Sequence, residues 1–183
     1  MGTYSAVSEL GIETSRHAAR FDASDMGEAS TTGAARLKVL LVASGGGHWV
    51  QLMRVASAFV EHECVYVTTV EGCEREVGGS RLHRVNDANQ WNRFGLLKLA
   101  LRILLIVLRE RPDVVVSTGA APGYFALRFG KFFGAKTTWL DSVANVEKLS
   151  LSGQLVGAYA DMWLTQWPHL SRPEGPFYEG AVL

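Results

Sequence analysis

Hydrophobic and polar positions follow two different periods along this chain, and the first change of period comes near residue 43. Residues 37–43 carry one charge among aliphatic side chains, which is typical of a strand buried on both faces. Residues 44–48 then read Ser-Gly-Gly-Gly-His. Beyond them, hydrophobic residues recur at helical spacing, at Leu52, Val55, Ala56 and Phe59. The pattern predicts a strand, a glycine turn and a helix.

Strand and helix patterns continue to alternate along the rest of the chain. The further strands are expected at residues 64–69, 82–85, 113–118, 136–140, 162–166 and 177–183, and the further helices at 94–110, 122–133 and 153–160. This alternation predicts an α/β, Rossmann-like fold with a mainly parallel sheet and helices on both faces. We expect one such domain over residues 37–183. Residues 1–36 are rich in Ala, Ser, Thr and Gly without a sustained period, which predicts a flexible extension.

Four loops of the predicted domain follow apolar strands and carry polar or glycine residues. They are residues 44–48, 118–123, 141–145 and 166–169. In an open α/β sheet, ligands bind beyond the carboxyl ends of the strands. We therefore expect the functional site at this edge of the sheet.

The overall composition excludes several classes of protein. The 18 basic residues balance the 18 acidic ones, so charge does not favour nucleic-acid binding. Cys64 and Cys73 have neither a metal-ligand spacing nor a disulfide framework. An N-terminal apolar signal is lacking, as is an uncharged run of the ~18–20 residues that span a bilayer. We expect a cytoplasmic protein, soluble or peripheral on the membrane.

The predicted helix over residues 94–110 is unusually apolar. Lys98, Arg102 and Arg109 share one narrow stripe at about 100° per residue, and almost all other positions are hydrophobic. The helix is either buried between the sheet and a partner with its stripe in solvent, or it lies at a membrane surface with its cations near anionic headgroups. Trp91 fits an interfacial anchor in the second case.

Two titratable residues at the expected site could carry chemistry. His48 ends the glycine turn, where a helix N-terminus also offers free N–H donors to an anion. It is either a general base, because an imidazole with a reference pKa of ~6.5 accepts a proton at neutral pH, or a structural residue of the turn. Asp141 directly follows a strand, which suits a catalytic residue, an N-cap or a salt-bridge partner. The turn matches neither G-x-G-x-x-G nor a Walker loop, and its glycines could serve packing alone.

Four segments are similar to one family when they are taken together. They are Val-Ala-Ser-Gly-Gly-Gly-His at 42–48, Val-Val-Val-Ser-Thr-Gly-Ala-Ala-Pro-Gly at 114–123, Lys-Leu-Ser-Leu-Ser-Gly at 148–153 and Gln-Trp-Pro at 166–168. In this order they resemble the acceptor-side subunits of two-component GT-B glycosyltransferases. That family includes the membrane-recruiting subunit of the N-acetylglucosaminyltransferase of dolichol-linked glycan assembly, and bacterial counterparts in capsule and exopolysaccharide synthesis.

The resemblance implies a function for residues 37–183. The chain would be the N-terminal, acceptor-binding half of a GT-B enzyme, and a partner chain would hold most of the UDP-sugar site. The reaction would be an inverting transfer that needs neither metal nor cofactor. Its acceptor would be a polyprenyl-diphosphate-linked sugar at the inner, cytoplasmic face of the membrane.

The resemblance also assigns roles to residues of this chain. His48 matches the histidine that ends the glycine-rich loop of the family and would deprotonate the acceptor hydroxyl. Asp141 would be the second catalytic residue, although many relatives have a glutamate there. The substrate would contact Ser44, Gly45, Gly46, Gly47, Thr118, Gly119, Ala120 and Gly123. Residues 1–36 depart from the eukaryotic members, which carry a membrane helix there, so anchoring would depend on residues 94–110 or on other proteins.

Two other functions remain open. The chain could be a non-catalytic scaffold that recruits the true enzyme to the membrane, with a structural His48. It could also be a free-standing nucleotide-binding protein, but Thr68 and Thr69 stand where that class has a ribose-binding carboxylate. The donor sugar, the acceptor sugar and the linkage are not predicted.

Overall fold

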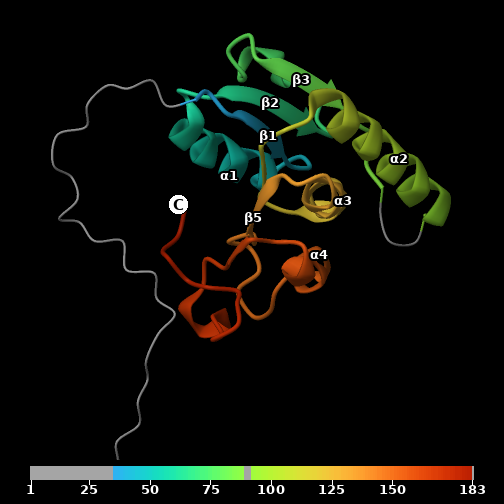
Figure 1. Ribbon diagram of the computed structural model, residues 1–183. Coiled ribbons are helices and arrows are strands. Elements are labelled where there is room, and N and C mark those ends of the chain that lie inside the picture. The colour runs from blue at the N-terminus through green and yellow to red at the C-terminus, as the bar shows by residue number, and fades with distance from the viewer. Residues whose placement is uncertain (1–34, 89–91, 183) are drawn as a thin grey trace, which may run out of the picture. The chain divides into compact units, whose positions relative to one another are not determined.

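A computed structural model describes residues 35–88 and 92–182, and the predicted extension over residues 1–36 falls almost entirely outside them. Figure 1 shows the arrangement of the described elements. The strands are β1 (Lys38–Val42), β2 (Glu63–Thr68), β3 (Arg81–Arg84), β4 (Val114–Ser117), β5 (Lys136–Leu140) and β6 (Met162–Leu164). The α-helices are α1 (Gly47–Ala56), α2 (Arg93–Glu110), α3 (Ala120–Phe132) and α4 (Leu151–Leu155). Short 3-10 turns are η2 (Ser57–Phe59), η3 (Cys73–Arg75), η4 (Val156–Ala158) and η5 (Pro168–Leu170).

Within the described residues the six strands form one parallel sheet in the order β3-β2-β1-β4-β5-β6. The chain runs outward from β1 to β3, then crosses back to β4 and runs outward on the other side. The strand order therefore reverses between β1 and β4, and the loops that follow these two strands meet at that point. The predicted parallel α/β fold is confirmed.

The sheet is covered on both faces because its central strands are apolar on both sides. Val39 and Leu41 of β1 pack with α1, whereas Leu40 and Val42 pack with α2 and α3 on the opposite face. All four side chains are fully buried. Burying each such side chain contributes about 1.5–3 kcal/mol, so the two apolar layers fix β1 at the centre of the domain.

Two predicted elements differ from the structure. A strand over 177–183 is wrong for the described part of this segment, where Phe177 forms an isolated bridge to Leu164. Gly180 has a φ of 117°, outside the range of a strand, and the Val182 N–H donates to the Gln166 side chain at 2.8 Å. The helix predicted over 153–160 is shorter and begins earlier, because Ser150 caps α4 and the chain then tightens into η4.

A buried carboxylate joins the C-terminal end of α2 to the sheet. Glu110 is 3% exposed, and its oxygens lie 2.9 Å from His83 Nε2, 3.3 Å from Arg81 Nη2 and 3.9 Å from Lys38 Nζ. These partners come from β1 and β3. One acidic side chain therefore fixes the last turn of α2 against two strands.

A second carboxylate joins α3, β5 and β6. Asp161 accepts hydrogen bonds from Lys131 and from the Thr137 backbone N–H, the latter at 2.9 Å. Burial raises the pKa of Asp161, but these hydrogen bonds outweigh burial and hold the pKa below its ordinary value. The carboxylate therefore stays ionised at neutral pH and keeps the start of β6 beside β5.

Candidate functional site

His48 and Thr118 hold each other at the point where the strand order reverses. The Thr118 hydroxyl donates to the His48 backbone oxygen at 2.7 Å, and His48 Nδ1 lies 2.9 Å from the Thr118 backbone oxygen. A carbonyl oxygen only accepts, so Nδ1 carries the hydrogen of this bond. In the neutral ring Nε2 then has the free lone pair and is the atom able to accept a proton.

Gly119 leaves space for the imidazole ring of His48. A Cβ at this position would overlap the His48 ring, and the residue has a φ of 142°, which side chains rarely tolerate. The next residue, Ala120, also has a positive φ, of 65°. This strained turn brings the backbone of Gly119 directly against the histidine.

The two helices that start at this point have uncapped N-termini. The N-cap residues of α1 and α3 are Gly46 and Gly119, neither of which gives a side-chain bond, and neither first turn has an acidic residue. In contrast, Asn92 caps α2 and Ser150 caps α4 through their side chains. Free N–H groups and the positive dipole end of α1 and α3 therefore remain available to an anion beside His48.

The predicted substrate-binding residues of the glycine turn lie at this site. Ser44 and Gly45 are partly buried, whereas Gly46 and Gly47 are exposed and lead into α1. Gly46 has a φ of 61°, so a glycine is needed for the turn itself. A Cβ on Gly45 would press on Val70, so this glycine also serves packing.

Gly123 differs from the other predicted substrate-binding residues. It is buried one turn into α3, and a Cβ there would overlap the Ser117 side chain of β4. Its lack of a side chain brings α3 close to the sheet. The structure favours packing over the ligand contact that the sequence predicts.

Asp141 is surrounded by donors from its own loop. The carboxylate is 1% exposed and accepts from the Ser150 hydroxyl at 2.7 Å, the Ser150 N–H at 3.1 Å and Asn145 at 3.0 Å. Trp139 Nε1 adds a bond of 3.2 Å. A carboxylate held in this way orders residues 141–150 and the start of α4. The structure therefore favours a positioning role over the catalytic role that the sequence predicts for Asp141.

Two buried amide side chains at this edge are hydrogen-bonded to each other, which the sequence does not predict. Gln166 Nε2 donates to Gln51 Oε1 and to the Asp141 backbone oxygen, both at 2.9 Å, and Gln51 Nε2 donates to Ser142 Oγ at 3.3 Å. Gln51 lies one turn after His48 on the buried side of α1. The amides therefore connect that helix to the loops after β5 and β6. A polar residue at an otherwise apolar helix position is the signal that marks Gln51.

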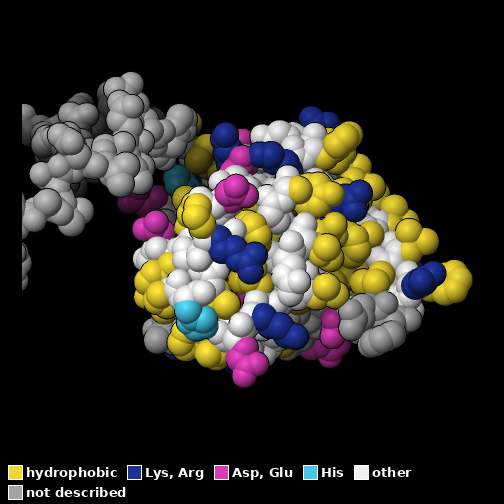
Figure 2. All heavy atoms as spheres, turned by 90° about the horizontal axis from the view of Figure 1, so that it is seen from below, with side chains coloured by type: hydrophobic (Ala, Val, Ile, Leu, Met, Phe, Trp, Pro, Cys, Tyr) yellow, Lys and Arg dark blue, Asp and Glu magenta, His cyan; other side chains and the backbone are white. Residues whose placement is uncertain are grey.

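The outer side of α2 is apolar and exposed within the described part of the chain. Phe94 is 84% exposed and Leu97 is 67% exposed, and the same side of the helix carries Leu101, Leu105 and Leu108. Figure 2 shows hydrophobic side chains gathered on the right-hand part of the surface, with Lys and Arg side chains among them. The sheet does not cover this side of α2, as the sequence predicts. Across residues 35–88 and 92–182, every helix is too short or too polar to cross a bilayer.

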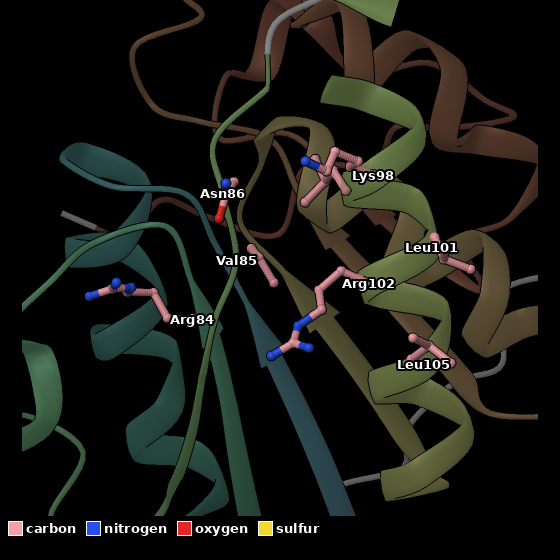
Figure 3. A pocket seen from close by; sticks show the side chains of 8 residues that line it. Arg84, Val85, Asn86, Lys98, Leu101, Arg102 and Leu105 are labelled. Carbon is pink, nitrogen blue, oxygen red and sulfur yellow. The ribbon is translucent and has the colours of Figure 1, made fainter. Parts of the chain in front are cut away.

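Two of the predicted headgroup cations line a pocket beside α2. Lys98 and Arg102 extend from the helix toward the segment that carries Val85 and Asn86 (Figure 3), around a cavity of about 330 Å³. In the part of the chain that the structure describes, neither cation forms an ion pair. Arg109 is exposed but does not line this pocket, and Trp91 lies outside the described residues.

Comparison with solved structures defines the class of the fold. The chain matches MurG from Acinetobacter baumannii with a TM-score of 0.64 and 13% identity, over 78% of this chain and 45% of that one. It matches the UDP-N-acetylglucosamine 2-epimerase from Rickettsia bellii with a TM-score of 0.60 and 15% identity, over 80% of this chain and 45% of that one. The chain has the Rossmann-like fold of one domain of a GT-B protein.

The sequence then identifies the family. Residues 75–179 match the family described as "Oligosaccharide biosynthesis protein Alg14 like", which is more than half of the chain, and the chain belongs to this family. The UDP-N-acetylglucosamine transferase subunit ALG14 of Yarrowia lipolytica is 33% identical over 72 residues, which are 36% of this chain and 33% of that protein. The subunit of Mus musculus is 25% identical over 170 residues, which are 73% and 77% of the two chains.

The match to the fungal relatives is partial. For the subunit of Schizosaccharomyces pombe the identity is 33% over 86 residues, which are 44% of this chain and 34% of that protein. The chain thus spans about a third of the two fungal relatives. The resemblance that the sequence predicts is confirmed at the level of the family.

Proposed function

We propose that this chain is the acceptor-binding subunit of a heteromeric glycosyltransferase. It binds a polyprenyl-diphosphate-linked sugar, and a second chain supplies most of the UDP-sugar site. The pair of uncapped helix N-termini beside His48 carries this proposal, because a diphosphate needs several N–H donors and an acceptor hydroxyl needs a base. The family supports lipid-linked oligosaccharide synthesis as the setting, and capsule or exopolysaccharide synthesis is the other setting that the sequence predicts.

The proposed reaction assigns one proton transfer to this chain. His48 Nε2 takes the proton of the acceptor hydroxyl while Nδ1–H stays bonded to the Thr118 carbonyl. The acceptor oxygen forms a bond to the anomeric carbon of the sugar, and the bond from that carbon to the phosphate breaks. UDP leaves with the electron pair on the face opposite to the attack, which inverts the anomeric centre.

The proposed function requires a second chain. The match covers 45% of MurG, so more than half of that protein has no counterpart in the match. Gentle extraction of tagged chain from cell membranes is expected to recover a second chain of similar size, identified by mass spectrometry. Recovery of the chain alone, with tight binding of nucleotides, would favour the free-standing nucleotide-binding alternative instead.

The apolar side of α2 is proposed to lie at the membrane surface, with Lys98 and Arg102 beside the phosphates of anionic lipids. A cation near such a surface contributes about 1 kcal/mol, so the double variant Lys98→Ala/Arg102→Ala is expected to bind vesicles about thirtyfold more weakly. Flotation with vesicles of phosphatidylcholine and phosphatidylglycerol measures this. Arg75→Ala/Lys136→Ala removes two exposed cations from other elements and is the matched control. An equal loss in both variants would contradict the assignment of α2 to the membrane.

A further inference from the structure

A second hollow lies beside the start of α3, and its lining is almost entirely apolar. It has a volume of about 510 Å³ and is open along one side to solvent. The walls come from three helices, with Leu96 from α2, Tyr124 and Phe125 from α3, and Leu151 and Leu155 from α4. Ala88, Ala121 and Ser152 complete the lining. We call this hollow the α3–α4 groove.

The groove contains apolar side chains that are exposed among the residues that the structure describes. Leu151 is 55% exposed and Leu155 is 54% exposed, and both belong to α4, whose buried residue is Gly153. Opposite them, the rings of Tyr124 and Phe125 lie edge to face, with centroids 5.4 Å apart. Apolar side chains on two facing walls gain free energy when an apolar ligand displaces water from between them.

The groove lies beside both the candidate site and helix α2. Ala121 lines the groove and stands in the first turn of α3, two residues after Gly119, which lies against His48. Leu96 lines the other wall from a partly buried position of α2, and the next residue, Leu97, belongs to the apolar outer side of that helix. The groove therefore lies between the uncapped N-terminus of α3 and helix α2, whose outer side is proposed to contact the membrane.

We propose that the α3–α4 groove binds the first isoprene units of the acceptor, next to its diphosphate. This assignment rests on the proposed function, since it extends the acceptor site from the diphosphate to the lipid. A ligand with an anionic end and a branched apolar chain satisfies both neighbouring features, because the anion takes the free N–H groups of α3 and the chain covers the leucines. A helix of a partner protein would cover the leucines and leave those N–H groups without an anion.

The test measures binding of two soluble probes to the purified chain by titration calorimetry. The probes are inorganic diphosphate and farnesyl diphosphate, which share the anion and differ in the isoprenoid. Farnesyl diphosphate is expected to bind at least about tenfold more tightly, since several CH₂ groups leave water. Leu155→Gln and Leu151→Gln are each expected to remove most of this advantage and to leave the affinity for inorganic diphosphate unchanged.

The matched control is Met162→Gln, because Met162 is 52% exposed but does not line the groove. It is expected to leave both affinities unchanged. Equal affinities for the two probes, or an equal effect of the groove and control variants, would overturn the groove while leaving the proposed function in place. Failure of both probes to bind would overturn the groove and the proposed acceptor site together. Loss of a co-purifying chain in Leu155→Gln, with probe binding intact, would assign the groove to a partner and overturn it as a lipid site.

Discussion

Replacing His48 with alanine is expected to lower the rate of sugar transfer by the assembled pair about 10²–10⁴-fold, the usual contribution of a general base. The structure explains why this one side chain has so large an effect. The Thr118 carbonyl orients the ring through Nδ1, which leaves Nε2 for the acceptor hydroxyl, and Gly119 allows the backbone of the α3 turn to approach. The rate is measured with a saturating UDP-sugar and a lipid-linked acceptor.

The His48→Ala variant should retain its fold, since Thr118 donates to the backbone oxygen of residue 48 and this bond survives. His169→Ala is the matched control, because His169 lies in a loop at the same edge and its Nε2 contacts the Val146 backbone oxygen. It is expected to change the rate little. A turnover of His48→Ala near that of the wild type, with membrane binding intact, would show that the chain is the non-catalytic scaffold.

Replacing Glu110 with alanine is expected to lower the free energy of unfolding by about 3 kcal/mol, the lower end of the range for breaking a buried ion pair. The carboxylate is 3% exposed and faces His83, Arg81 and Lys38. Its removal takes away the acidic partner of the His83 ring, leaves Lys38 and Arg81 with Glu63 as their remaining acidic partner, and frees the last turn of α2. The side chains of Lys38, Arg81 and His83 are partly exposed, so water offsets some of the loss.

Urea denaturation at neutral pH measures this effect on stability. Glu61→Ala is the control, because Glu61 is exposed and substitutions at such positions usually change stability by less than about 0.5 kcal/mol. If both variants lost the same small amount, Glu110 would not be the residue that fixes α2. In that case the position of the apolar surface and of the pocket at Lys98 and Arg102 would need another explanation.

The sheet could be predicted from the sequence because parallel strands are buried on both faces. Continuous aliphatic runs such as residues 37–43 and 113–118 are typical of buried parallel strands when they alternate with segments of helical period. The segment from residue 177 begins with two aromatic residues and resembles such a run, but the backbone of Gly180 is outside the extended range and the Gln166 side chain accepts a hydrogen bond from the Val182 N–H. A side-chain partner that is distant in sequence decides the conformation there.

The site could be predicted only in part, because tertiary contacts determine the role of some of its residues. The glycine turn and His48 are visible because three glycines before a titratable residue are unusual in a packed turn. Whether Asp141 faces a ligand depends on Ser150, Asn145 and Trp139, which surround it only in the folded chain. The hydrogen bond between Gln51 and Gln166 joins residues 115 positions apart, and the sequence around either residue does not indicate its partner.

The central claim is that this chain is one half of a glycosyltransferase and completes its site only with a second chain. The most direct measurement compares transfer of labelled sugar from UDP-N-acetylglucosamine to a polyprenyl-diphosphate-linked acceptor by this chain, by its co-purifying partner and by the two together. We predict transfer by the mixture and only background by either chain alone. Transfer by this chain alone at the rate of the mixture would contradict the claim.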